Sequence, residues 1–405
     1  MIHFSYIILG AGPSGLALAH SFINNGVPKN KILVLEKEAI AGGLCRSQEV
    51  DGAPLDIGGG HFLDMRKKEV LDFLFRFMPR SEWRFHQRVS KIMIHGHLID
   101  HPLEANLWQL PRPLQIDYLE SIAKTGSLRG EPMPTSFVDW IEWKLGQRIA
   151  QDYMLPYNKK LWSTDLNKLG TYWLYKLPNV SFRETLQSCL EGKAFGSLPA
   201  HGTFLYPESH GYGEVWRRMG EALGDQVIFN FSLQHINIES RIINNQWQAD
   251  TIINTIPWPC WTSAVDIPEA IRRKIAELEH VSINVDYQPE NLNSHAHWIY
   301  DPSNSVSHHR QLLRHNFCPG SRGYWIETNA KRSPDAVSYF RNHNDFAYPI
   351  NTQRKPEAIK AILEWAKSKR IVGAGRWGTW EHMNSDIAVH EAMLLADKLL
   401  AENTQ

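Results

Sequence analysis

Three glycines near the N-terminus have the spacing of a loop that binds a nucleotide. They form the pattern Gly10-x-Gly12-x-x-Gly15, and an acidic residue, Glu36, follows about twenty residues further on. Glycine allows a tight turn and a close approach of the main chain to a pyrophosphate, and the carboxylate is placed to bind ribose hydroxyls. The pattern therefore predicts a site for a dinucleotide cofactor.

The flanking sequence supplies the elements that such a site requires. Residues 2–9 (IHFSYIIL) are typical of a buried strand, and the apolar spacing of residues 14–25 predicts a helix that ends at Gly26. A second apolar run, residues 31–35, ends directly before Glu36. This order indicates a Rossmann-like unit whose helix points its free N–H groups at an anion.

A second glycine-rich segment indicates which of two dinucleotides, NAD or FAD, the first loop binds. It reads AGGLCRS at residues 41–47 and DIGGGHF at residues 56–62. Its first glycine pair lets the main chain reach a pyrophosphate, Arg46 offsets charge there, and the run at residues 58–60 leaves room for a flat ring. The segment resembles the FAD-binding signature of the amine oxidase, protoporphyrinogen oxidase and UDP-galactopyranose mutase superfamily. The resemblance implies that the cofactor is FAD.

The resemblance also implies cofactor contacts far along the chain. Leu233 would offer its backbone to the adenine, and Asn384 or Ser385 would begin a helix whose N-terminus meets the flavin. The expected cofactor-binding residues are Gly10, Gly12, Pro13, Ser14, Gly15, Glu36, Lys37, Gly42, Gly43, Leu44, Arg46, Gly59, Gly60, His61, Leu233, Gly375, Arg376, Ser385, Asp386 and Ile387.

Composition restricts the partners. Lys plus Arg and Asp plus Glu both number 43, so the net charge gives no reason to expect nucleic acid. Cys45, Cys189, Cys260 and Cys318 form no CxxC pair, which indicates neither a metal site nor a disulfide framework. No stretch approaches the ~20 apolar residues that span a bilayer. We expect a cytoplasmic protein with no metal, no nucleic-acid partner and no membrane span, and the oligomeric state stays open.

The order of the predicted elements divides the 405 residues into five segments. Besides the elements above, we predict helices over residues 66–78, 268–280 and 356–368, and a hairpin over residues 89–103. We expect an α/β fold with a Rossmann-like FAD-binding domain of the glutathione-reductase type. That domain is assembled from residues 1–100, 201–266 and 369–405, with a helical insert over 101–200 and a mixed-sheet substrate domain over 267–368.

Four further stretches resemble UDP-galactopyranose mutase. They are PYNKKLW (156–162), FLYPESHGYGEVW (204–216), WIYDPSNSVSHHRQLLRHNFCP (298–319) and GRWGTWEHMNSDIAVHEA (375–392). The resemblance implies pyranose–furanose isomerisation of a nucleotide sugar, in cell-surface polysaccharide synthesis. In that reaction N5 of the reduced flavin attacks the anomeric carbon, displaces UDP and forms an adduct. The flavin then needs a transient reductant such as NAD(P)H.

By family position, Lys176 and Arg310 would bind the substrate diphosphate, although lysine lacks the two-pronged grip of arginine. His382 stands where the family usually has a tyrosine, and a histidine can also donate to phosphate. His61 would lie beside the flavin. The predicted catalytic residues are His61, Lys176, Arg310 and His382, and the predicted substrate-binding residues are Tyr157, Asn158, Trp162, Lys176, Tyr206, Arg310 and Asn316.

Blander interpretations stand beside these. Lys176 could equally be a solvated surface lysine, and Arg310 could form a structural ion pair. His61 could be a packed histidine that holds its loop, and Trp162 could be a core residue of the insert. Two other functions also stay open. One is an oxidase or dehydrogenase of the amine oxidase or protoporphyrinogen oxidase type, which the altered positions Lys176 and His382 favour. The other is a scaffold in which FAD serves folding alone.

Overall fold

The computed structural model describes residues 1–405 except 175–179, 197–201, 265, 334–338 and 404–405. Lys176, a predicted site residue, lies outside the described residues. Within the described part of the chain, no helix combines the length and the apolar character needed to cross a membrane.

A seven-stranded sheet carries the glycine loop. Its central strand β1 (Ile2–Leu9) pairs in parallel with β2 (Ile32–Leu35) on one side and with β13 (Trp247–Asn254) on the other. The outer strands are β10 (Val227–Ile228) beside β2, β19 (Ile371–Gly373) and β12 (Ile242–Ile243) beside β13, and β11 (Ile236–Asn237) beside β12. The glycine loop thus follows the strand at the centre of the sheet.

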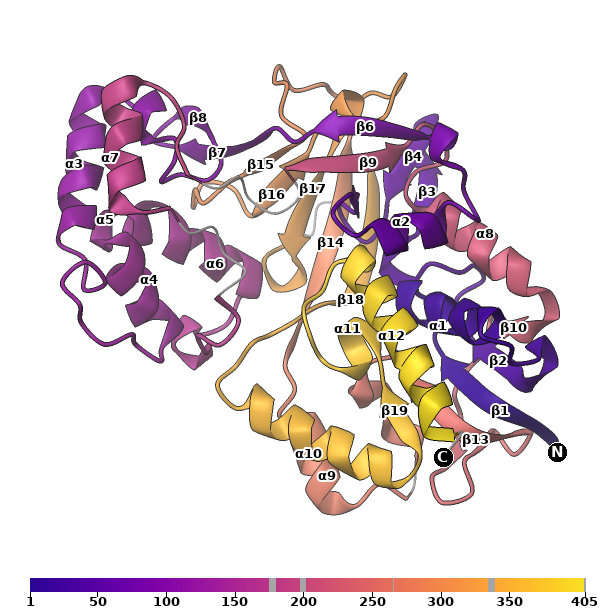
Figure 1. The fold of residues 1–405 in the computed structure, drawn as a ribbon. Coiled ribbons are helices and arrows are strands. Elements are labelled where there is room, and N and C mark those ends of the chain that lie inside the picture. Colours follow the sequence, from indigo (N-terminus) through magenta and orange to yellow (C-terminus); the bar gives the residue numbers. More distant parts are fainter. Residues whose placement is uncertain (175–179, 197–201, 265, 334–338, 404–405) are drawn as a thin grey trace.

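Helices bury both faces of this sheet, which explains why β1 is almost entirely apolar. Tyr6 and Ile8 of β1 belong to one apolar cluster, and Ile7 and Leu9 to another. The helices that contribute to the first cluster include α1 (Pro13–Asn24), α8 (Gly213–Leu223) and α12 (Ser385–Asn403), and the second includes residues of α9 (Glu269–Ala276) and α10 (Lys355–Ser368). Figure 1 shows α1 and α12 side by side, and α9 beside α10.

A second seven-stranded sheet stands over the first. Its strands in spatial order are β18 (Phe340–Pro349), β14 (His280–Gln288), β17 (Tyr324–Asn329), β16 (Arg310–Leu312), β15 (Trp298–Tyr300), β7 (Ser90–Ile94) and β8 (His97–Asp100). β7 pairs in parallel with β15, so the hairpin of residues 90–100 joins this sheet. Most of this hairpin falls in the expected FAD-binding segment 1–100, because its long-range pairing with β15 is not predictable from local sequence.

Small sheets and short helices connect the two parts. They are β3 (Ser47–Val50) with β4 (Ala53–Asp56), β9 (Thr203–Pro207) between β5 (Leu63–Asp64) and β6 (Trp83–Gln87), and the helices α2 (Lys68–Leu74) and α11 (Gly375–Gly378). The expected helix over 66–78 is therefore shorter. The expected helix over 268–280 ends early, because His280 already pairs with Pro349 in the second sheet.

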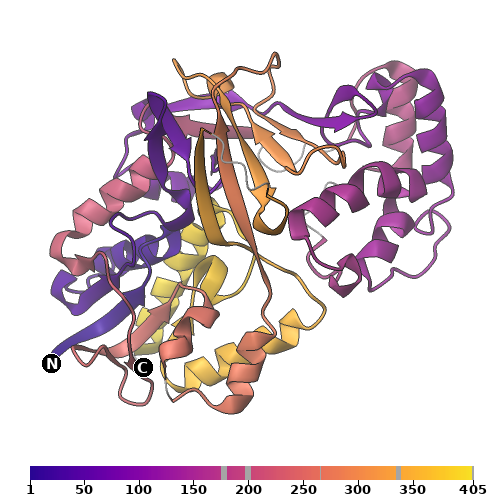
Figure 2. The same ribbon diagram turned by 180° about the vertical axis from the view of Figure 1, so that it is seen from behind.

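The helical insert projects from one end of the second sheet, at the left in Figure 1 and at the right in Figure 2. It contains α3 (Arg112–Ala123), α4 (Phe137–Leu145), α5 (Gln147–Ile149), α6 (Leu155–Trp162) and α7 (Phe182–Glu191). A π-helix, Ala150–Met154, joins α5 to α6 without a break. This insert brings Tyr157 toward the second sheet.

Candidate functional site

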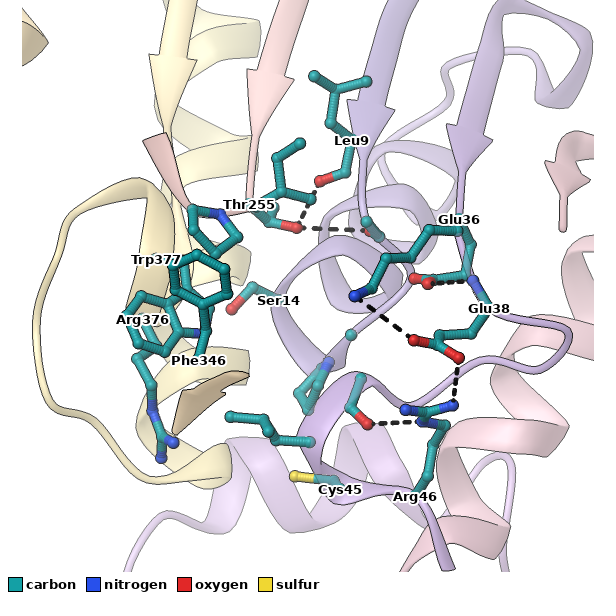
Figure 3. Close-up of a pocket in the computed structure, with 18 of the residues that line it drawn as sticks. Leu9, Ser14, Glu36, Glu38, Cys45, Arg46, Thr255, Phe346, Arg376 and Trp377 are labelled. Carbon is teal, nitrogen blue, oxygen red and sulfur yellow. Dashed lines mark hydrogen bonds and ion pairs between the residues drawn. The ribbon is translucent and has the colours of Figure 1, made fainter. Parts of the chain in front are cut away.

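A cavity of about 600 Å³ lies at the carboxyl ends of β1, β2 and β13. This edge of a parallel sheet is where such folds bind their ligands, and the volume suits a bound small molecule. Figure 3 shows that the walls come from distant segments: Glu36, Glu38 and Arg46 on one side, and Phe346, Arg376 and Trp377 on the other. Leu233 also lines the cavity, as the adenine prediction requires.

The three glycines of the first loop have three different neighbourhoods. Gly10 has φ +101°, and a Cβ there would lie 2.6 Å from Oγ1 of Thr255. A Cβ at Gly15 would lie 2.0 Å from the carbonyl oxygen of Gly10. At Gly12 a Cβ would meet no atom closer than 3.9 Å, and this residue lines the cavity. Gly10 and Gly15 therefore permit the turn, and Gly12 keeps the space where a pyrophosphate would approach.

Glu36 is 5% exposed and lines the same cavity. Oε2 accepts a hydrogen bond from the Ala11 N–H at 2.7 Å, and Oε1 accepts one from the Glu38 N–H at 2.9 Å. Burial raises the pKa of this carboxyl, and the two N–H groups oppose that rise. Each carboxylate oxygen keeps a further lone pair, so Glu36 has the capacity to bind ribose hydroxyls.

Arg46 has a second partner besides the expected anion. Nη1 donates to Oε2 of Glu38 at 3.0 Å, and Nε donates to the carbonyl oxygen of Gly43 at 2.9 Å. Lys37 lies 3.6 Å from Glu38, measured from Nζ to Oε1. Glu38 therefore neutralises part of the positive charge of Arg46, which the sequence analysis expects to balance the charge of the pyrophosphate. Arg46 also stabilises the turn at Gly43.

The glycine run at residues 58–60 packs closely against the protein itself, which is a reason for glycine in addition to the flat ring that we expect it to accommodate. A Cβ at Gly58 would lie 1.9 Å from the Leu44 carbonyl oxygen. A Cβ at Gly59, where φ is +94°, would lie 2.5 Å from a carboxylate oxygen of Glu327. At Gly60 it would lie 2.0 Å from the side chain of Leu312.

His61 lines the cavity directly after this run. Nδ1 lies 2.9 Å from the Gly59 carbonyl oxygen, and a carbonyl only accepts, so Nδ1 carries the proton. Burial, aided by the positive charge of Arg376, lowers the pKa of His61 to about 4. At neutral pH the ring is therefore uncharged and Nε2 is an acceptor. The interaction with Gly59 also matches the blander prediction of a histidine that holds its loop.

Arg310 is held by a fully buried carboxylate. Its Nε and Nη2 lie 2.9 and 2.6 Å from Oε2 of Glu327, while Oε1 of Glu327 accepts a hydrogen bond from the Gly60 N–H at 3.0 Å. Burial acts to raise the pKa of Glu327, but Arg310, His309 and the Gly60 N–H outweigh it and hold the pKa at about 2. Nη2 of Arg310 also donates to the Tyr348 hydroxyl at 3.3 Å.

Arg310 thus forms the structural ion pair that we gave as the alternative to a role in phosphate binding. This ion pair uses only Nε and Nη2 of the guanidinium. Nη1 of Arg310 has no hydrogen-bond partner among the described residues, and the side chain is 20% exposed. Glu327 therefore fixes one edge of the guanidinium and leaves a donor for an anion.

Aromatic rings surround Arg310 and connect it to other predicted residues. The Tyr157 ring meets the Tyr300 ring edge-on at 5.6 Å between centroids, and the Tyr348 ring lies 5.2 Å from the His382 ring. Arg376 packs its guanidinium 5.6 Å from the Tyr348 centroid and donates to two backbone carbonyls. The structure therefore brings Tyr157, Arg310, His382 and Arg376 into one region.

Four predicted substrate contacts are used inside the protein instead. Asn158 accepts a hydrogen bond from the Trp162 indole N–H at 2.8 Å, within α6, and both side chains are buried. Asn316 donates to the carbonyl oxygens of residues 294 and 296. Tyr206 is 0% exposed, and its hydroxyl donates to the buried Asp56. These arrangements favour structural roles for all four.

Two charged residues in this region were missed by sequence reasoning. Glu327 is a lone acid in a strand, and nothing local marks it. Arg88 places its guanidinium 4.6 Å from the Trp298 ring centroid and donates to the Tyr300 hydroxyl at 3.3 Å. Neither has a motif, because Glu327 reaches the site through the pairing of β17 with β16, and Arg88 lies in the loop just before β7, which pairs with β15.

Comparisons with known proteins agree with this geometry. The family described as NAD(P)-binding Rossmann-like domain matches residues 8–77. An uncharacterised protein in the nifH2 3′ region of Methanothermococcus thermolithotrophicus is 44% identical over 52 residues, which are 13% of this chain. That match spans 47% of the relative, about half of its length.

Solved structures match over the whole chain. A crystal structure of reduced UDP-galactopyranose mutase has a TM-score of 0.88 and 21% identity, covering 100% of this chain and 95% of the mutase chain. The crystal structure of a candidate protoporphyrinogen oxidase from Exiguobacterium sp. 255-15 has a TM-score of 0.71 and 14% identity, and the match covers 99% of each chain. The chain therefore has the fold of these proteins, the predicted fold class is confirmed, and the matches agree with the FAD prediction.

Proposed function

We propose that this chain is an FAD-dependent enzyme that interconverts the pyranose and furanose forms of a nucleotide sugar. One observation carries the proposal: Glu327 bonds both Arg310 and the Gly60 N–H, so a cation with a free donor is fixed next to the glycine run and His61. The fold shared with the reduced mutase over the full chain supports it.

The residues of the cavity fit FAD. The open space at Gly12 and the start of α1 would take the pyrophosphate, and Glu36 the ribose. Leu233 would lie at the adenine, and His61, Arg376 and the N-terminus of α12 at the flavin. When bound, reduced FAD supplies the nucleophile for the sugar carbon.

The chain's own residues would bind and orient the substrate. Nη1 of Arg310 donates to the diphosphate of the leaving nucleotide, which stabilises the charge that develops as the sugar bond breaks. Tyr157 packs beside this region, and His382, whose ring meets the Tyr348 ring, is the further residue that we propose to contact the diphosphate. His61, neutral with a free Nε2, accepts a hydrogen bond within the site. Lys176 remains a proposed second phosphate contact.

The test uses purified protein with bound flavin. The protein is reduced with dithionite without oxygen, UDP-galactofuranose is added, and UDP-galactopyranose is followed by chromatography, with oxidised protein as the control. Conversion by the reduced sample alone supports the proposal. Equal activity in both samples, or none in either while UDP does not bind, refutes it.

A second candidate is an oxidase of the protoporphyrinogen or amine oxidase type. The His382 departure and the full-length match to the Exiguobacterium protein favour it. Oxygen uptake and peroxide release with a porphyrinogen or an amine, together with no sugar conversion, would establish this candidate in place of the mutase.

A further inference from the structure

A network of polar side chains lies outside the nucleotide cavity, where the hairpin β7–β8 meets the helical insert. Oδ2 of Asp152 accepts hydrogen bonds from the Tyr118 hydroxyl at 2.9 Å and from Nε2 of His95 at 3.0 Å. The same oxygen lies 2.8 Å from Nε of Arg148. One carboxylate oxygen thus joins the hairpin, α3 and the segment from α5 into the π-helix. We call these four residues the Asp152 network.

Two backbone irregularities meet at this network. His95 has φ +51° and is the first residue of a two-residue turn, a position that favours Asn, Asp or Gly. Asp152 lies within the π-helix Ala150–Met154, a rare geometry that is frequent at functional sites. Conformations of this kind persist only where the surroundings hold them, so their coincidence points to a function.

The other face of this helical segment reaches the substrate region. Tyr153 follows Asp152 directly, and its ring lies 5.9 Å from the ring of Tyr157. The Tyr157 ring in turn packs against Tyr300 and, at 6.0 Å, against His309, the neighbour of Arg310. A displacement of the π-helix would therefore move Tyr157 relative to the guanidinium of Arg310.

The far end of α6 has its own anchors. Nζ of Lys160 donates to the carbonyl oxygens of Asp301 and Ser303 at 2.8 and 2.6 Å, and Nδ2 of Asn329 donates to the Leu161 carbonyl oxygen at 2.8 Å. The second sheet thus holds the C-terminal end of α6. The Asp152 network holds the segment that leads into its N-terminal end.

We propose that Asp152 and His95 are positioning residues for the substrate site: together they hold the π-helix so that Tyr157 stands beside Arg310. The proposal rests on the function proposed above, because the site that Tyr157 completes is the nucleotide-sugar site. It extends the binding machinery to residues that contact neither substrate nor cofactor.

The test replaces His95 by a residue that suits its turn. His95→Asn removes the imidazole but is favoured at this turn position, so the hairpin keeps or gains stability. His97→Asn is the matched control, since His97 lies in the same hairpin, is exposed, and its side chain has no hydrogen bond to any described residue. We expect the KM for UDP-galactofuranose to rise roughly tenfold in His95→Asn, through a displaced Tyr157, with kcat little changed. Asp152→Asn should raise KM similarly, and His97→Asn should leave it unchanged.

Amide hydrogen exchange over residues 155–162 is measured on the same holoproteins without substrate. Faster exchange in His95→Asn and Asp152→Asn than in His97→Asn, together with the higher KM, supports the proposal. Unchanged exchange overturns it, whatever the substrate is. Faster exchange with an unchanged KM also overturns it, because the network then serves stability alone. If the wild type neither converts the sugar nor binds UDP, the proposed function fails, and the exchange data still test the anchoring of α6.

Discussion

Replacing Glu327 by Gln tests whether a buried charge organises the site. The substitution keeps the shape and the acceptor for the Gly60 N–H, but it removes the negative charge that faces Arg310. The folded pKa of Glu327 is about 2, against an ordinary value of 4.5. Each pKa unit corresponds to about 1.4 kcal/mol, so the ionised carboxylate contributes roughly 3 kcal/mol at pH 7.

The pH dependence gives this prediction its sign. The folded pKa is depressed, so the contribution is complete above about pH 4.5 and is lost as the pH falls toward 2. The difference in unfolding free energy between wild type and Glu327→Gln should therefore narrow by roughly 1 kcal/mol from pH 7 to pH 4. Urea unfolding at both pH values, followed by tryptophan fluorescence, measures this.

An exposed acid provides the control. Glu357 is 81% exposed in its ion pair with Lys274, and solvent screens such a pair, so Glu357→Gln should leave the unfolding free energy nearly unchanged. We also expect Glu327→Gln to raise the KM for the nucleotide sugar, because Arg310 loses the partner that orients it. A stability loss below about 1 kcal/mol at pH 7 would show that Arg310 does not need this carboxylate, and the reasoning would be refuted.

Three further predictions follow from the same structure. Gly12→Val places a side chain in the cavity, so the protein should fold with an unchanged circular dichroism spectrum yet purify without flavin absorbance, and a yellow variant would contradict this placement. Arg314→Met removes a fully buried guanidinium that donates to the carbonyl oxygens of Val50, Ala53 and Arg322, so unfolding free energy should fall by about 3–5 kcal/mol, and a loss under 1 kcal/mol in a denaturant titration would count against it. The folded pKa of His61 is lowered, so the stability of the protein is highest above about pH 6.5, where the ring is neutral in both states, and falls as the pH drops toward 4. Between these pH values, the unfolding free energy of flavin-free His61→Gln should therefore fall less than that of the flavin-free wild type. Equal decreases would show that another group causes the titration.

The parts of the site that sequence could predict are those fixed by local backbone demands. Gly10 has a positive φ, and a Cβ at Gly15 would collide with Gly10 and Ile8 of the same loop, so both demands are local; only the crowding of Gly10 by Thr255 and Ile256 comes from far along the chain. Glu36 follows from the strand–loop–helix order in the same way. The glycine run at 58–60 was recognised, but the contacts that exclude a Cβ at Gly59 and Gly60 come from Glu327 and Leu312, far along the chain, which local sequence does not show.

The misses arise from strand register and from helix spacing. Glu327 faces Arg310 because β17 pairs with β16, and Arg88 comes close to Trp298 and Tyr300 because β7, which begins just after it, pairs with the distant strand β15. No local pattern encodes either pairing. Asn158 and Trp162 are different, because they are four residues apart in a segment that becomes a helix. That spacing predicts a side-chain contact within the helix, and the observed hydrogen bond is its result. Helix geometry was therefore a better guide to these two residues than family position.

The charges gathered around Tyr300 and Tyr348 bear on the kind of ligand that fits. Arg88 bonds Tyr300, Arg310 bonds Tyr348, and Arg376 stacks on Tyr348, so three guanidinium groups lie along one line of aromatic rings. Glu327 ionises even at low pH and offsets one of these charges. The remaining positive charge suits a diphosphate, and the rings give a flat surface beside it for a base or a sugar. A cationic amine would meet like charges here, which favours the nucleotide sugar over the amine as substrate.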